Sequence, residues 1–176
     1  SVSADPKIAF SIIMKRGFDI IAAGAGLLVL APILILIALA IKLDSRGPIL
    51  FKQRRVGQDF KPFWIYKFRT MLDASVPGAP SITVATDPRI TGIGALLRKS
   101  KMDEMPQLFN ILRGDMSLVG PRPEVPRYVA LFYRDYEEVL TVRPGLTDMA
   151  SLKYRDEASL LAQYDRPEDE YVTNLL

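Results

Sequence analysis

Two adjacent carboxylates, Asp103 and Glu104, stand in the stretch SKMDEMPQLFNILRGDMSLVGPRP, which covers residues 100–123. Pro106 fits a helix only within its first turn, so the apolar run after it predicts a helix that begins close to both carboxylates. A helix N-terminus has unpaired N–H groups and the positive end of the helix dipole, which stabilise carboxylates and bound phosphate alike. The residues alone leave two interpretations open. Asp103 is either a helix cap, worth about 1 kcal/mol, or a group that does chemistry at a phosphate.

The composition restricts that chemistry. The 176 residues include neither cysteine nor histidine, which excludes disulfides, thiolate zinc sites and a thiol nucleophile. Catalysis would therefore use carboxylates, Lys, Arg, Tyr or hydroxyl groups, and a metal would take oxygen ligands, which favours magnesium, manganese or calcium. With 23 Lys and Arg against 20 Asp and Glu, the net charge of +3 is too small to indicate a nucleic-acid partner.

Three arginines are candidate phosphate ligands. Arg98 lies five residues before the first carboxylate and adds a positive charge nearby. Arg122 stands between two prolines that fix the backbone on both sides of it. Rigid presentation of a guanidinium suits bidentate phosphate binding, although a structural salt bridge would give the same pattern. Arg143, in the stretch VRPGLTD, repeats the arrangement of arginine before proline.

Residues 49–71, ILFKQRRVGQDFKPFWIYKFRTM, predict a β-hairpin, because two extended runs flank a Gly-Gln-Asp turn. Strand alternation in the second run puts Lys67 and Arg69 on one face, an arrangement that suits a phosphate. The alternative is a solvated edge strand whose charges prevent aggregation. Residues 46–72 contain seven Lys or Arg and one acid, so anionic lipid headgroups are a further candidate partner.

The remaining elements follow from helical spacing and turn residues. Apolar periodicity predicts a short helix that ends in Arg98 and Lys99, and a second helix with Gly114 just after its end. A longer amphipathic helix is predicted from Tyr128 to Leu140, and its aromatic side chains suit either a core or a membrane interface. Residues 73–89 are rich in Pro, Gly, Ser and Thr and predict a loop.

Residues 20–41 form an uncharged apolar segment, IIAAGAGLLVLAPILILIALAI. As a helix it would be about 33 Å long, enough to cross the core of a bilayer. Pro32 stands in its middle, where it removes one backbone hydrogen bond. Both flanks are basic, which favours the cytoplasmic side for both ends. A hairpin that enters the membrane, bends at Pro32 and returns satisfies both observations, and a tilted, kinked spanning helix is the alternative.

Several stretches together resemble the bacterial monotopic phosphoglycosyl transferases, which start glycans on a polyprenol carrier. The resemblance covers roughly residues 15–157. It is carried by KRGFD before an apolar stretch with a central proline, by YKFRTM, by DPRITGIGALLRKSKMDEMPQLFNILRGDMSLVGPRPE, and by VRPGLTD.

The resemblance implies a function and a mechanism. A UDP-sugar donates a sugar 1-phosphate to polyprenyl (undecaprenyl) phosphate, and UMP is released. Asp103 is implied to attack the β-phosphate and to carry the phosphosugar covalently, with Glu104 as its partner. Both carboxylates are implied metal ligands for Mg²⁺.

The resemblance also implies the architecture. It is a helix-rich α+β fold, with a re-entrant membrane helix hairpin broken at Pro32 in residues 1–46. Residues 47–176 then form a small cytoplasmic catalytic domain with interfacial helices, on the inner (cytoplasmic) membrane of a bacterium. Members usually continue past the point that corresponds to Leu176, so we expect a C-terminus that is either truncated or partly disordered.

Attack of a carboxylate on a diphosphate must overcome the repulsion between anions, so cations must surround the site. The side chains predicted to supply this charge, in addition to Mg²⁺, are Lys67, Arg98, Arg122, Arg143 and Arg155. One departure concerns RPGLTDMASLKYRDE, where many relatives read RPG-[IL]-TG-x-A-Q-V-x-G-R. We expect that difference to bear on the choice of donor sugar.

Two other functions remain open. The chain could be a non-enzymatic membrane adaptor, which recruits partners through its basic surface and amphipathic helices. Alternatively, Asp103 or Glu104 could hold the metal while polyprenyl phosphate attacks the donor directly, without a covalent intermediate.

Overall fold

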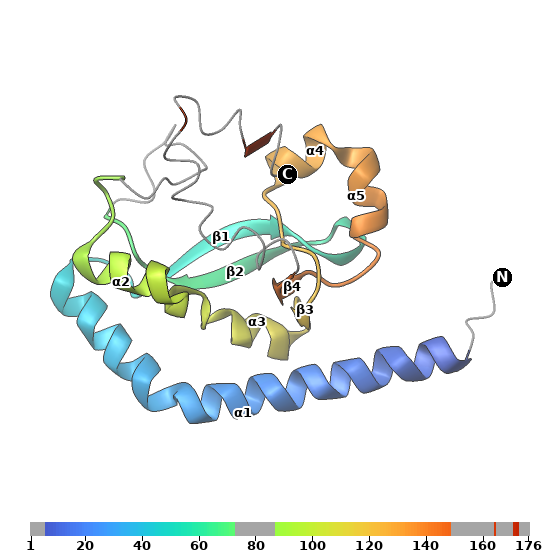
Figure 1. The fold of residues 1–176 in the computed structure, drawn as a ribbon, viewed down its shortest axis with the longest axis horizontal. Helices are drawn as coiled ribbons and strands as arrows, with labels where there is room; N and C mark the ends of the chain where they lie inside the picture. Colours follow the sequence, from blue (N-terminus) through green and yellow to red (C-terminus); the bar gives the residue numbers. More distant parts are fainter. Residues whose placement is uncertain (1–5, 73–86, 149–163, 165–170, 173–176) are drawn as a thin grey trace.

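The computed structural model describes residues 6–72, 87–148, 164 and 171–172. The structure is helix-rich α+β, as predicted: a long N-terminal helix runs along a body of short helices and two small sheets (Figure 1). Most of the predicted loop at 73–89 lies outside the described residues. The predicted division between residues 46 and 47 stays a prediction.

The predicted hairpin is confirmed. Strands β1 (Leu50–Val56) and β2 (Pro62–Phe68) pair antiparallel, and the 3₁₀ turn η1 (Gln58–Phe60) connects them. Its faces differ in burial, since Ile65 is buried whereas Trp64 is 55% exposed. The hairpin therefore provides one face for a core.

Helix α2 (Gly92–Ser100) and helix α3 (Gln107–Arg113) are the two short helices that the periodicity predicts. Thr91 caps α2, because its hydroxyl accepts a hydrogen bond from the Gly94 N–H at 2.9 Å. Gly114 ends α3 with a φ of 92°, a left-handed conformation that glycine adopts without strain. The predicted position of Gly114 is confirmed.

One buried amide joins α3 to the hairpin. Asn110 is fully buried, and its Nδ2 donates to the Trp64 carbonyl at 2.7 Å. Its Oδ1 accepts from the Tyr66 N–H at 3.1 Å. The side chain thus satisfies both backbone groups at the edge of β2 that β1 does not cover, as a third strand would.

Two further strands, β3 (Ser117–Val119) and β4 (Gly145–Thr147), pair in parallel. They bring together the two proline-containing loops that carry candidate arginines, and the Gly145 N–H donates to the Pro121 carbonyl at 2.8 Å. Glycine is required at this crossing, because a Cβ on Gly120 or Gly145 would collide with the opposite backbone.

The amphipathic helix predicted near the C-terminal half is two helices. Helix α4 (Pro126–Leu131) and helix α5 (Tyr133–Val139) are separated at Phe132, whose φ of −116° and ψ of 38° are not helical. The prediction of one longer helix was wrong, since apolar periodicity does not register a single non-helical residue.

Helix α1 (Pro6–Asp44) contains Pro32 and continues past it. Among the described residues, one helix is long and apolar enough to cross a membrane, over Phe10–Asp44. Figure 1 shows α1 beneath the other elements, with its light-blue C-terminal part turning up toward α2. The predicted re-entrant form in a membrane stays a prediction.

Apolar contacts hold α1 against the body on both sides of its central proline. Ala23 is buried in a cluster with residues of β2 and α3, and Ile41 is buried in a second cluster with residues of β2 and α2. The side chains on the other side of α1 are exposed; Leu28 is 78% exposed and Leu43 is 88% exposed. One apolar face of α1 thus remains uncovered by the described residues.

Polar contacts fix the N-terminal part of α1 to the body. Arg16 donates to the Ile111 carbonyl at 2.7 Å and to the Leu112 carbonyl at 3.1 Å, at the C-terminal end of α3. Asp19 is buried and accepts from the Ser117 hydroxyl at 2.8 Å and from the Leu118 N–H at 3.1 Å. The KRGFD stretch is therefore an anchor between α1, α3 and β3.

Arg69 fixes the other end of α1. Its Nη1 donates to the Arg46 carbonyl at 2.9 Å, and its Nη2 donates to the Ser45 carbonyl at 2.8 Å. Arg69 directly follows the last residue of β2, and its guanidinium is used at the end of α1, so the predicted phosphate site at Lys67 and Arg69 stays a prediction.

Replacement of Asp19 tests the anchor. Asp19→Ala leaves a buried hydroxyl and a backbone N–H without their acceptor, so we expect the free energy of unfolding to fall by about 1–3 kcal/mol. The measurement is thermal or denaturant unfolding in detergent micelles.

Asp44→Ala is the matched control, because Asp44 is an exposed aspartate on the same helix. We expect it to change the free energy of unfolding by less than about 0.5 kcal/mol. Equal effects of the two substitutions would contradict the anchoring role of Asp19.

Candidate active site

The two carboxylates lie in the 3₁₀ turn η2 (Met102–Glu104), between α2 and α3. Lys101 joins α2 to this turn in a left-handed conformation, with a φ of 58°. Pro106 stands at the N-cap position of α3, so the helix begins at Gln107, slightly later than predicted. The dyad therefore occupies a tight connection between two helices.

Asp103 is 8% exposed, and its Oδ1 is buried with no hydrogen-bond partner in the part of the chain that the structure describes. Its side chain caps neither helix, since Thr91 caps α2 and the N-cap of α3 is Pro106. The cap interpretation was wrong. An unpaired buried carboxylate destabilises a fold, so this group is a candidate for a functional role.

Glu104 is paired. Lys67, which projects from β2, donates from Nζ to Glu104 Oε1 at 2.6 Å, and both side chains are mostly buried. This is a charge-assisted hydrogen bond in a region of reduced solvent access, which is stronger than an exposed ion pair. It joins the hairpin to the dyad.

Burial and charge act differently on the two carboxyls. Burial raises the pKa of Asp103; Lys67 and Arg98 act against this, and the neighbouring Glu104 acts with it. Burial also acts to raise the pKa of Glu104, but the salt bridge with Lys67 outweighs it, with help from Arg122, so that this pKa is lowered. Burial thus disfavours the charged form of Asp103, whereas the contact with Lys67 stabilises the charged form of Glu104.

The structure brings three of the predicted cations to the dyad. Lys67 contacts Glu104, and the charges of Arg98 and Arg122 act on Asp103 and Glu104 respectively. The other two predicted cations are placed differently. Arg143 donates from Nε to the Gly114 carbonyl at 3.0 Å, at the opposite end of α3, and Arg155 lies outside the described residues.

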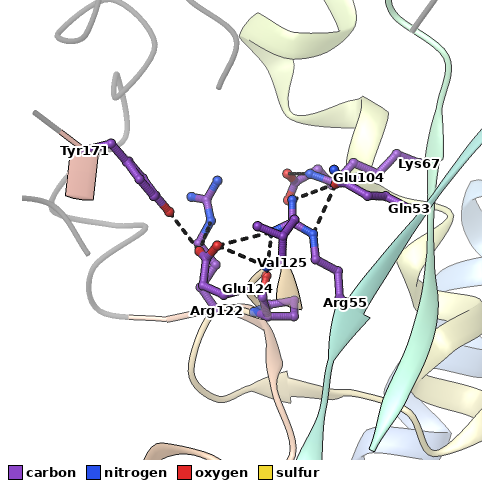
Figure 2. A network of polar contacts seen from close by, with 9 residues as sticks. Gln53, Arg55, Lys67, Glu104, Arg122, Glu124, Val125 and Tyr171 are labelled. Atoms are coloured by element: carbon purple, nitrogen blue, oxygen red, sulfur yellow. Dashed lines mark hydrogen bonds and ion pairs between the residues drawn. The ribbon is translucent and has the colours of Figure 1, made fainter. Parts of the chain in front are cut away.

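A network that the sequence did not predict lies beside the dyad (Figure 2). Glu124, which is 5% exposed, accepts from Arg55 Nη1 at 3.3 Å and from the Tyr171 hydroxyl at 2.8 Å. Arg122 Nε lies 3.8 Å from the same carboxylate. The sequence offered one signal for this network, an acidic residue directly after Pro-Arg-Pro. Its partners, Arg55 and Tyr171, are too distant in the sequence to be identified from that signal.

The dyad offers oxygen ligands of the kind that Mg²⁺ binds. The unpaired Asp103 Oδ1 and the adjacent Glu104 are consistent with a site of two carboxylates completed by water and substrate phosphate. The described residues contain no group of three or more carboxylates that could hold a metal by themselves. The residues therefore fit a magnesium ion that is bound together with a phosphate substrate.

A sequence model of the family described as bacterial sugar transferase matches residues 10–175. The chain belongs to this family. An undecaprenyl-phosphate glucose phosphotransferase of Komagataeibacter xylinus is 48% identical over 154 residues, which are 84% of this chain. The exopolysaccharide production protein PSS of Rhizobium leguminosarum bv. phaseoli is 44% identical over 163 residues, or 89% of this chain. A UDP-glucose:undecaprenyl-phosphate glucose-1-phosphate transferase of Caulobacter vibrioides is 43% identical over 153 residues.

These bacterial sugar transferases differ in length. The matched region is 29% of the Komagataeibacter protein, 56% of the Caulobacter protein and 79% of the Rhizobium protein. The family match covers both the KRGFD anchor and the dyad, so both features lie within the region that the family model describes.

The unpaired state of Asp103 has a measurable consequence. Asp103→Asn removes a buried charge, so we expect it to raise the unfolding temperature of the metal-free protein, whereas loss of a helix cap would cost about 1 kcal/mol. Because the pKa of Asp103 is raised in the folded state, protonation favours folding. The difference between the variant and the wild type should therefore shrink as the pH is lowered through that pKa.

Asp115→Asn is the control, because the charge of Asp115 has partners: Oδ2 lies 3.6 Å from Arg113 Nε and accepts a hydrogen bond from Asn110 at 3.1 Å. We expect this substitution to lower the unfolding temperature. A fall of similar size for Asp103→Asn would show that Asp103 has a stabilising partner.

Proposed function

We propose that this chain transfers a sugar 1-phosphate from a UDP-sugar to polyprenyl (undecaprenyl) phosphate, releases UMP, and so performs the first membrane step of glycan biosynthesis. The observation that carries this proposal is the buried Asp103 Oδ1, which has no hydrogen-bond partner among the described residues, in a dyad on which the charges of Lys67, Arg98 and Arg122 act. Membership of the bacterial sugar transferase family and the names of its relatives supply the substrate class.

The reaction has two steps. An oxygen of Asp103 forms a bond to the β-phosphorus of the donor, and UMP leaves with the bridging oxygen, which gives an aspartyl-phosphosugar. A phosphate oxygen of the polyprenyl phosphate then attacks the same phosphorus and releases the carboxylate. A carboxylate whose oxygen makes no hydrogen bond is suited to this attack, because no partner has to be displaced first.

The cations lower the repulsion between the attacking carboxylate and the diphosphate. Arg98 and Arg122 are proposed to contact phosphate oxygens, and Lys67 to hold Glu104 in its charged form through their 2.6 Å contact. Arg143 and Arg155 remain predicted phosphate ligands. For Arg143 this requires a rearrangement, since its contact with the Gly114 carbonyl places it at the C-terminal end of α3, away from the dyad.

Asp103 and Glu104 would hold Mg²⁺. When bound, the ion would neutralise charge on the diphosphate and orient the leaving phosphate. Because Glu104 is already paired with Lys67, the lysine would keep this carboxylate oriented beside the ion.

We also propose that α1 is a re-entrant membrane helix broken at Pro32, and that residues 47–176 form the catalytic domain on the cytoplasmic face of the inner membrane. The contacts at the two ends of α1 support this topology. Arg16 and Asp19 bind the body at one end, and Arg69 binds the other end to the same body. A helix perpendicular to the bilayer would carry one of these ends to the far side, about 30 Å away.

A screen of UDP-sugars with undecaprenyl phosphate in detergent, with UMP as the product detected, tests the activity. We expect UMP release with at least one donor. We expect none with Asp103→Asn, and a loss of about 10²–10⁴-fold with Glu104→Gln. Omission of Mg²⁺ should also abolish release.

Two results would contradict the proposal. Full turnover by Asp103→Asn would exclude Asp103 as the nucleophile. Lipid binding without nucleotide release for any donor would favour the adaptor function.

Cysteine labelling tests the topology, because the chain contains no cysteine of its own. With Ser11→Cys and Asp44→Cys, a membrane-impermeant maleimide should react at both positions in inverted vesicles and at neither in right-side-out vesicles. Leu28→Cys should be protected in both preparations. Reaction of the two ends from opposite sides would establish a spanning helix instead.

A further inference from the structure

We propose that Glu124 is a positioning residue that holds the guanidinium of Arg122 in place for the donor diphosphate. This inference rests on the proposed function, in which Arg122 contacts phosphate. It assigns a role to a buried acid that does not belong to the dyad.

The Glu124 carboxylate is held from two sides. Its Oε2 accepts from Arg55 Nη1 at 3.3 Å, and its Oε1 accepts from the Tyr171 hydroxyl at 2.8 Å. Its backbone carbonyl accepts from the Val56 N–H at 2.9 Å. A buried carboxylate with this many fixed partners has little freedom to move, so it holds a fixed position beside Arg122.

Arg55 is the fixed cation of this arrangement. It donates from Nη1 to the Pro123 carbonyl at 2.9 Å and from Nε and Nη2 to Gln53 Oε1. Figure 2 shows Arg55 between Gln53 and Glu124. Because these donors are already used by protein groups, Arg55 anchors the loop and is not the arginine that meets substrate.

Arg122 is the arginine that Glu124 directs. Its backbone lies between two prolines, and its Nε is 3.8 Å from Glu124 Oε1. Through this contact Glu124 orients the guanidinium, whose Nη edge is the one that binds a phosphate in bidentate fashion. The influence of Arg122 on the pKa of Glu104 places its charge near the dyad.

The negative charge of Glu124 also permits two guanidinium groups to lie close together. Burial lowers the pKa of Arg55; the Glu124 carboxylate opposes this, and Arg122 adds to it. Without the carboxylate, Arg55 and Arg122 would repel each other. Since Arg55 is fixed by its other acceptors, Arg122 is the side chain that would move.

A double-mutant cycle tests the inference. The four proteins are the wild type, Glu124→Gln, Arg122→Ala and the double variant. Two quantities are measured: the Kd for UDP by calorimetry, and the kcat and KM for the UDP-sugar donor. We expect Glu124→Gln to weaken UDP binding and to raise the donor KM by about tenfold, while in the Arg122→Ala background the same change has no further effect.

Glu137→Gln is the matched control, because Glu137 is exposed on α5 and undergoes the same chemical change. It should leave both quantities unchanged. If Glu124→Gln fails to fold, Tyr171→Phe replaces it, since that change removes the 2.8 Å hydrogen bond to Glu124 and leaves the carboxylate in place. We expect a two- to threefold effect from Tyr171→Phe that likewise disappears in the Arg122→Ala background.

The outcomes separate this inference from the proposed function. Additive effects of Glu124→Gln and Arg122→Ala, or wild-type UDP binding by Glu124→Gln, overturn the positioning role even if the wild type releases UMP. A coupled loss of UDP binding supports the positioning role even if the wild type transfers no sugar phosphate, in which case only the proposed function fails. A wild type that neither binds UDP nor releases UMP overturns both.

Discussion

The fixed position of α3 is the constraint on which the rest of the structure depends. At its C-terminal end, Arg16 from α1 binds the carbonyls of Ile111 and Leu112, and Arg143 from the loop before β4 binds the carbonyl of Gly114. Cations at this end satisfy unpaired carbonyls and interact favourably with the helix dipole. Asn110 fixes the same helix sideways to β2. The dyad immediately before α3 is therefore held in position relative to both the long apolar helix and the hairpin. The same contacts connect the site to the proposed membrane element.

Around this helix the charges are unevenly compensated. Glu104 and Glu124 each have a cationic partner, whereas the Asp103 Oδ1 has no hydrogen-bond partner among the residues that the structure describes. An unpaired buried group persists in a fold only when its surroundings hold it there, at a cost in stability. In the proposed reaction the phosphorus of the donor would form a bond to this carboxylate. The buried carboxylate that lowers the stability of the fold is thus the group that is proposed to react.

Sequence reasoning predicted the features that depend on neighbours along the chain. The hairpin around Gly57, the C′ position of Gly114 and the proximity of Arg98 to the dyad all follow from local spacing and turn chemistry. It did not predict contacts between distant segments: Asp19 with Ser117, Arg69 with the end of α1, the pairing of β3 with β4, or Tyr171 with Glu124. The residues in these contacts are of common types, and nothing in their local sequence identifies the distant segment that each one meets in the fold. The cap interpretation of Asp103 failed because the sequence does not show that Asp103 lies in a 3₁₀ turn before α3.

The central claim is that Asp103 accepts the phosphosugar. It is tested most directly by the intact mass of the wild-type protein after incubation with a UDP-sugar that it accepts and Mg²⁺, without polyprenyl phosphate. The account predicts a mass increase equal to one sugar phosphate. This adduct should lie on the peptide that contains Asp103 and should disappear when polyprenyl phosphate is added. An unmodified mass under conditions in which the complete mixture releases UMP would contradict the covalent mechanism and would favour direct attack by the lipid phosphate.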